Sequence, residues 1–115
     1  MKPIKYELRK DKKLYSKENE IIDGYKRSER YSFTPEVLED AGMLTQNHIL
    51  EKYLKQKENY TYIGTIEMKH QTHNYYVEYY YTENGIIAFL IYEPKGKYYP
   101  SLDTILIYER KGDVC

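Results

Sequence analysis

The sequence predicts an α+β fold: a small single domain in which two short helices pack on a three- to five-stranded antiparallel meander. Three observations lead to this prediction. The chain has 115 residues, which suits one domain with one core. Residues 34–57 carry helix start signals and the apolar spacing of a helix, and from residue 60 onward apolar and polar side chains alternate as in strands.

The N-terminal part of the chain is basic. Residues 1–30 hold ten Lys or Arg residues against six Asp or Glu residues, a net charge of +4, although the whole chain is neutral. Residues 4–8 alternate apolar and charged side chains and predict a strand, whereas residues 25–33 fit either a strand or an extended arm. We therefore predict a basic N-terminal segment over residues 1–33, made of a strand and an extended arm, and an α+β core over residues 34–115.

Two helices are expected at the start of this core. Thr34 is a favourable N-cap, Pro35 follows at the first helical position, and Gly42 suits the C-terminal end, so the first helix is predicted at about 35–41. The second is predicted at about 46–57, because one apolar stripe recurs there at helical spacing: Ile49, Leu50, Tyr53 and Leu54.

Four strands are expected after the helices, at about 60–68, 75–82, 86–93 and 103–109. The strongest local signal among them is Asn84–Gly85, which favours a two-residue type I′ turn between the second and third strands. Such a turn would place Tyr80 opposite Phe89. The last strand, 103–109, is a plausible edge of the sheet, and an exposed edge needs protection.

Alternation along this hairpin divides its side chains between two faces of the sheet. The first face carries no charge and is expected to pack on the apolar stripe of the helices; it holds Tyr75, Val77, Tyr79, Tyr81, Ala88, Leu90 and Tyr92. The second face is amphipathic and holds Tyr76, Glu78, Tyr80, Thr82, Ile87, Phe89, Ile91 and Glu93. Either the N-terminal segment or a partner must cover this second face.

Catalytic and metal-binding motifs find little support. His70 and His73 lie three residues apart in a loop, and His48 and Cys115 stand at no spacing that would complete a zinc site. The sequence contains no nucleophile elbow and no glycine-rich phosphate loop. We expect neither an enzyme nor a cofactor.

Location is indicated by cysteine usage and hydropathy. Cys115 is the single cysteine, so no disulfide can form within the chain, and a cytoplasmic setting is expected. The first eight residues lack the apolar stretch of a signal peptide. No apolar run reaches the roughly 18 residues of a membrane span, so no membrane is expected as a partner.

Nucleic-acid binding is one alternative for function. Residues 34–55 resemble a helix-turn-helix motif in having Gly42 between two helices, but His48 and Glu51 stand where that motif buries aliphatic side chains. Tyr-rich sheets can also stack bases. A basic arm would then supply the phosphate contacts through Lys5, Arg9, Lys10, Lys12, Lys13, Lys26, Arg27 and Arg30.

Protein binding is the preferred prediction. The chain has sixteen tyrosines, two phenylalanines and no tryptophan, and half-exposed tyrosines are typical of interfaces. The partner-binding residues are predicted on the second face: Tyr76, Glu78, Tyr80, Phe89 and Ile91. The small size and Tyr-rich composition resemble the accessory proteins of phages and mobile elements. This resemblance implies an inhibitor of a host defence enzyme, of the anti-CRISPR type; a homodimer is the alternative partner arrangement.

Overall fold

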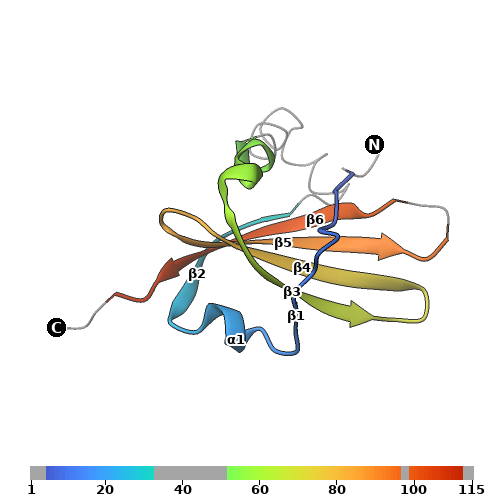
Figure 1. Cartoon of the computed structure of the whole chain (residues 1–115), viewed down its shortest axis with the longest axis horizontal. Coiled ribbons are helices and arrows are strands. Elements are labelled where there is room, and N and C mark those ends of the chain that lie inside the picture. The colour runs from blue at the N-terminus through green and yellow to red at the C-terminus, as the bar shows by residue number, and fades with distance from the viewer. Residues whose placement is uncertain (1–4, 33–51, 97–98, 113–115) are drawn as a thin grey trace.

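A computed structural model describes residues 5–32, 52–96 and 99–112 of the chain. Within these residues one six-stranded sheet dominates, with the strand order β1-β3-β4-β5-β6-β2 (Figure 1). The strands are β1 (Leu14–Tyr15), β2 (Tyr25–Ser32), β3 (Thr61–Lys69), β4 (His73–Tyr81), β5 (Gly85–Pro94) and β6 (Ser101–Arg110). The helical elements are α1 (Asn19–Ile22), residues 52–56, and the 3-10 helix η1 (Lys57–Asn59).

The predicted α+β class is wrong, because the protein is mostly β and its sheet is mixed. Strands β3 to β6 do form an antiparallel meander. The N-terminal part of the chain then adds a strand at each edge: β1 is parallel to β3, and β2 is antiparallel to β6. Of the predicted helices, 35–41 lies outside the described residues, and the described part of 46–57 is helical at residues 52–56.

The strand predicted at residues 4–8 is not one of the strands of the sheet. Residues 5–13, called the strap below, cross over the sheet instead, and only Lys5 forms an isolated bridge, with Ser101 of β6. The backbone N–H of Tyr6 donates to the carbonyl of Pro100, and at the other end the carbonyl of Lys13 accepts from Thr65 N–H of β3. The strap therefore spans the sheet from β6 to β3, as its dark blue trace shows in Figure 1.

The last predicted strand is not an edge. Strand β6 lies between β5 and β2 and pairs with both. The edge strand on this side of the sheet is β2, in which Lys26, Arg27 and Arg30 are all exposed. Charged side chains of this kind oppose pairing of an open edge with another chain. Because an exposed edge strand needs no apolar alternation, residues 25–33 gave only an ambiguous strand signal.

The β4–β5 turn is centred one residue earlier than predicted, between Glu83 and Asn84 and not between Asn84 and Gly85. Tyr81 pairs with Ile86 and Tyr80 with Ile87, so the register differs by two residues from the expected one. Thr82 organises the turn: its N–H donates to the carbonyl of Gly85, and its hydroxyl oxygen accepts from Gly85 N–H. An even shift leaves every side chain on its predicted face, because faces alternate with a period of two.

Gly85 is required by close packing as well as by backbone conformation. Its φ is +157°, and a Cβ at this position would lie 2.1 Å from the carbonyl oxygen of Tyr108 in β6. Among the described residues, positive φ angles occur at glycines only. Asn84 therefore does not adopt the positive φ that a type I′ turn demands at both central positions.

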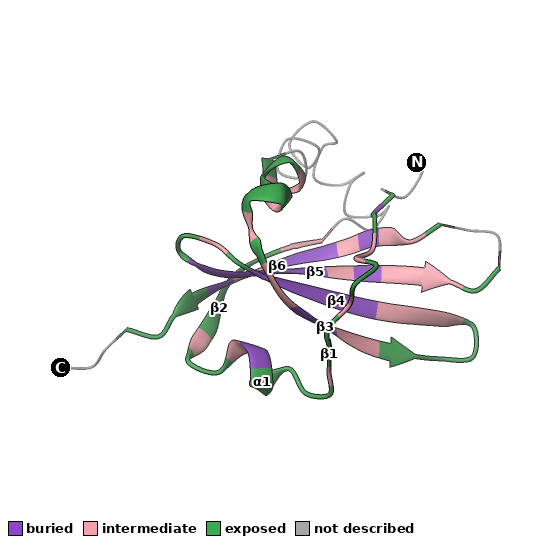
Figure 2. Ribbon diagram, viewed as in Figure 1, coloured by how far each residue is buried: buried purple, intermediate pink, exposed green. Residues whose placement is uncertain are grey.

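Two clusters of buried side chains lie on opposite sides of the sheet (Figure 2). The strap face, covered by the strap and by residues 52–60, buries Tyr6, Tyr76, Tyr80, Ile87, Phe89, Ile91, Leu102 and Ile105. The α1 face, covered by α1, buries Ile21, Val77, Tyr79, Ile86, Ala88 and Tyr108. Strand β5 has apolar side chains on both faces, as expected for a strand inside the sheet.

Candidate functional site

The five residues predicted to contact a partner lie in the core of the strap face. Tyr76 is 6% exposed and the other four are at most 1% exposed: Glu78, Tyr80, Phe89 and Ile91. Tyr6 of the strap lies on Phe89, with their ring centroids 5.6 Å apart. In this arrangement the N-terminal segment, rather than a partner, covers these side chains.

The expected docking of the helix on the uncharged face is wrong. Tyr53 and Leu54, the described part of the helix stripe, pack against the buried cluster of the strap face. The physical reason is Glu78, a carboxylate that this face must bury. Such a group requires hydrogen-bond donors and a cation, and the segments that cover the strap face supply them.

Glu78 stands at the centre of a buried polar network. Its Oε1 accepts hydrogen bonds from the hydroxyls of Tyr6, at 2.8 Å, and Tyr80, at 3.0 Å. Its Oε2 accepts from the backbone N–H of Arg9, at 2.8 Å. One carboxylate therefore joins the strap to strand β4 from inside the core.

Lys57 of η1 supplies the positive charge of this network. Its Nζ lies 3.7 Å from Oε1 of Glu78 and 3.9 Å from the ring centroid of Tyr6, and it donates to the carbonyl of Glu7. Burial lowers the pKa of the Lys57 ammonium, and the charge of Glu78 opposes that change. The lysine is held between a carboxylate and aromatic rings, an arrangement that favours a cation.

A second carboxylate organises tyrosines on the α1 face. Oε1 of Glu18, just before α1, accepts hydrogen bonds of 2.9 Å from both Tyr79 and Tyr108. Burial, reinforced by Glu18, raises the pKa of both phenols above the ordinary value. The protein thus satisfies buried tyrosine hydroxyls with one carboxylate on each side of the sheet.

The basic residues of the predicted nucleic-acid site fall on two elements. Lys5, Arg9, Lys10, Lys12 and Lys13 belong to the strap, whereas Lys26, Arg27 and Arg30 belong to β2. Several strap cations lie over tyrosine rings: Lys12 over Tyr76 at 3.9 Å, Arg9 over Tyr62 at 4.5 Å, Lys13 over Tyr15 at 5.4 Å, and Lys5 over Tyr99 at 5.8 Å. These cation–π contacts with tyrosine rings help to hold the strap on the sheet.

The two histidines predicted in a loop join a cluster of rings, and His73 is the first residue of β4. His70 and His73 are stacked with centroids 4.9 Å apart, and His73 also contacts Tyr75 at 4.9 Å and Tyr92 at 5.2 Å. In residues 5–32, 52–96 and 99–112, no group of three or more His, Cys, Asp or Glu side chains could hold a metal ion. Cys115 and His48 lie outside the described residues.

The rings of His73, Tyr75 and Tyr92 belong to an uncovered part of the α1 face. We call this part the open patch and define it as Met68, His73, Tyr75, Leu90 and Tyr92. Met68 pairs with Tyr75, and Tyr75 with Tyr92. Met68 is 43% exposed and the other four are half-buried. Figure 2 shows this loss of burial toward the ends of β3, β4 and β5 at the right of the view, beyond α1. The open patch carries aromatic and apolar groups at the surface.

Sequence reasoning missed both the partners of Glu78 and the open patch. A glutamate in the middle of an apolar strand signals a required cation, but the sequence does not say that Lys57 provides it. Tyr75 and Tyr92 were assigned to the face that packs against helices. The short length of α1, four residues against the nine of β4, leaves them partly uncovered.

Comparisons with known proteins give no relative from which a role could be taken. No family model matches the chain, and no match was found among curated proteins or solved structures. Within the described ranges, no helix has the length and apolar character needed to cross a membrane.

Proposed function

We propose that this protein is a non-catalytic protein-binding domain that contacts its partner through the open patch. The observation that carries the proposal is the half-exposed ring cluster of His73, Tyr75 and Tyr92 beside exposed Met68. Tyrosine and methionine are enriched in protein interfaces, and the centres of interfaces are depleted of charge. The open patch has this composition, on the rigid surface of a sheet.

The surface differs from the one predicted from sequence, although the class of function is the same. Tyr76, Tyr80 and Phe89 serve the core in this proposal, and Tyr75 and Tyr92 take the role of contact residues. The narrower proposal, inhibition of a host defence enzyme by occupying its surface, draws on size and composition. A cytoplasmic setting, expected from the single Cys115, completes the proposal.

The test is a double substitution, Tyr75→Ala with Tyr92→Ala, compared with Leu14→Ala. Leu14 is 60% exposed on β1, so its truncation removes an exposed apolar side chain outside the open patch. We expect a partner captured from host lysate by the wild-type protein to be retained by Leu14→Ala and lost with the double variant. Tyrosine hot spots typically contribute about 2 kcal/mol or more to binding, so the affinity should fall at least tenfold.

Self-association needs its own measurement. Light scattering of the purified wild-type protein reports whether the open patch is covered by a second copy. A dimer that becomes a monomer in the double variant identifies that second copy as the partner. If the double variant binds every partner of the wild type with unchanged affinity, the proposed role of the open patch is wrong.

The nucleic-acid alternative makes a different prediction. Phosphate contacts release counterions, so affinity would fall steeply with salt. The strap cations Arg9, Lys12 and Lys13 are already held over tyrosine rings, which favours a structural role for them. We expect no saturable binding of single-stranded or duplex DNA or RNA at low salt. Saturable, salt-sensitive binding would favour the alternative.

A further inference from the structure

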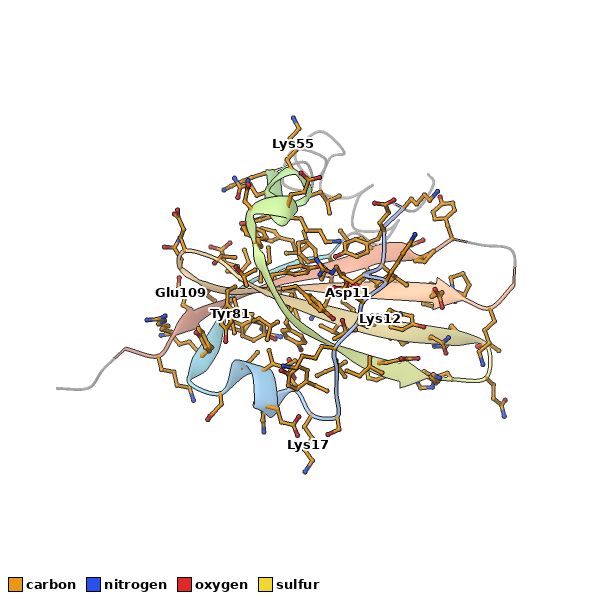
Figure 3. All side chains as sticks on the ribbon, viewed as in Figure 1. Asp11, Lys12, Lys17, Lys55, Tyr81 and Glu109 are labelled. Atoms are coloured by element: carbon orange, nitrogen blue, oxygen red, sulfur yellow. The ribbon has the colours of Figure 1, made fainter. Side chains whose placement is uncertain are left out.

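A cleft of about 690 Å³ opens between residues 52–61 and the end of the sheet that carries the β4–β5 turn. Strands β2 and β6 also contribute to its wall through Glu29 and Glu109. Figure 3 shows Tyr81 and Glu109 at this same end of the sheet. The volume lies within the range of pockets that hold small ligands or peptide side chains, about 300–1,000 Å³.

The lining of the cleft combines tyrosines with carboxylates. Tyr53 and Tyr60 contribute from the segment that covers the strap face, together with three glutamates, Glu29, Glu83 and Glu109. Tyr81 and Tyr108 also border the cleft, but they share the α1 face with Ile86, their register partner. Lys52 is the single cationic residue among the described lining residues. The cleft therefore has an excess of negative charge.

One of these glutamates, Glu109, has a cation opposite it in the sheet, because it is the register partner of Lys26. In the part of the chain that the structure describes, none of the three forms an ion pair. Glu29 accepts a hydrogen bond from the neutral hydroxyl of Tyr31. All three glutamates are exposed. Carboxylates that form no ion pair around a concave surface attract cations and concentrate them there.

The protein contains an occupied example of the same chemistry. Nζ of Lys57 lies 3.7 Å from the Glu78 carboxylate and 3.9 and 5.6 Å from the ring centroids of Tyr6 and Tyr80. A lysine thus binds between tyrosine rings and a glutamate in this fold. The cleft provides both kinds of group, and at its wall Nζ of Lys52 lies 5.3 Å from the ring centroid of Tyr53.

We propose that the cleft binds lysine or arginine side chains of a basic peptide segment belonging to a protein partner. The rings of Tyr53 and Tyr60 supply cation–π contacts, and Glu83 and Glu109 supply charge-assisted hydrogen bonds. An open cleft of this volume accepts several side chains of an extended segment. It shares no residue with the open patch, so the two proposals fail independently.

The experiment is a titration of isotope-labelled protein with a short oligolysine peptide and a short oligoarginine peptide, followed by NMR. We expect saturable shifts of the amides of the β4–β5 turn, including Asn84 and Gly85. The double variant Glu83→Gln with Glu109→Gln keeps side-chain size and should weaken binding about tenfold, equivalent to about 1.4 kcal/mol.

A matched control separates this site from general attraction of cations. Glu20→Gln with Glu67→Gln removes the same charge from outside the cleft and should leave the affinity within about twofold of wild type. The ring contribution is tested at Tyr60, where Tyr60→Phe should bind normally and Tyr60→Leu should bind more weakly. Equal weakening in the two double variants, or no saturable shifts at the turn, overturns the proposal. Free spermidine that binds as tightly as the peptides overturns the assignment to a peptide segment.

Discussion

The hydroxyl of Tyr6 donates a 2.8 Å hydrogen bond to the carboxylate of Glu78, a residue 72 positions later in the chain. Glu78 is fully buried, and its other donors include the N–H of Arg9, also from the strap. This relationship makes the N-terminal strap part of the core, since without it the carboxylate would lose two of its donors.

Removing the Glu78 carboxylate should destabilise the protein strongly. Glu78→Ala leaves Lys57 and two tyrosine hydroxyls without their acceptor, and truncating one partner of a buried charge pair typically costs about 3–5 kcal/mol. We expect a loss of this size in the free energy of unfolding, measured by urea denaturation. The control Glu20→Gln, at an exposed position of α1, should change stability by less than about 0.5 kcal/mol. Similar stability of the two variants would show that the network contributes little.

The strap hydrogen bond can be tested by a smaller change. Tyr6→Phe removes one hydroxyl that donates to a charged group, and such a bond contributes about 1.5–3 kcal/mol. Tyr75→Phe is the matched control, because no hydrogen bond of the Tyr75 hydroxyl is found among the described residues. Hydrogen exchange at the Arg9 amide should accelerate in Tyr6→Phe and not in Tyr75→Phe. Unchanged exchange in Tyr6→Phe would contradict the role assigned to this hydroxyl.

Alkaline pH should unfold the protein. Burial raises the pKa of Tyr6, Tyr79, Tyr80 and Tyr108 above the ordinary 10.0, with Glu78 or Glu18 adding to the effect. Below about pH 10 both states keep these protons, so the stabilisation is complete. Above it the unfolded chain loses protons that the folded state retains, and stability falls by about 1.4 kcal/mol per pH unit for each tyrosine.

Two measurements check this pH dependence. Denaturant unfolding at several pH values from about 9 to 11 should show a steepening loss of stability above about 10. The absorbance of tyrosinate should show the four buried tyrosines ionising only as the fold is lost. Replacing Tyr79 and Tyr108 together by Phe should make the loss shallower. Stability that stays constant across this range would contradict the burial of these phenols.

Gly85 and Gly96 provide a matched pair for the packing of the β4–β5 turn. Both have positive φ, +157° and +122°, but a Cβ at Gly85 would meet the Tyr108 carbonyl at 2.1 Å, whereas nothing lies within 4 Å at Gly96. Backbone strain costs each alanine variant about 1–3 kcal/mol, and the clash should add about 1–3 kcal/mol for Gly85→Ala. Thermal or urea unfolding of both variants measures the difference. Equal destabilisation of the two variants would mean that β6 can move away from the added Cβ without a loss of stability.

The meander and its two faces could be predicted from sequence because both depend on local alternation. Strands β3 to β6 lie close to the predicted ranges, and Tyr76 and Tyr79 lie on opposite faces as expected. The hairpin register could not be predicted, since the hydroxyl of Thr82 replaces a backbone acceptor in the turn. Turn propensities at Asn84–Gly85 contain no information about that contact.

The class of fold was missed because the N-terminal strands are specified by distant partners. β1 has two residues, and β2 is a charged edge strand, so neither shows the pattern of a half-buried strand. The strap face is covered through contacts of Tyr6 and Lys57 with Glu78, residues that lie far apart in the sequence. The sequence showed that something had to cover Tyr76, Tyr80 and Phe89, and the identity of the cover required the structure.

The place of strand β6 late in the chain affects the order in which the parts of the fold can form. The strap reaches it through the Tyr6 N–H and the Pro100 carbonyl, and β2 pairs with it alone. A ribosome synthesises residues 101–110 long after both of these segments. Strand β2 and the start of the strap therefore lack these hydrogen-bond partners while the nascent chain lengthens, whereas β1 can pair with β3 earlier. Chains with such non-local pairing fold slowly, and this one should depend on protection of its exposed tyrosines until synthesis has passed β6.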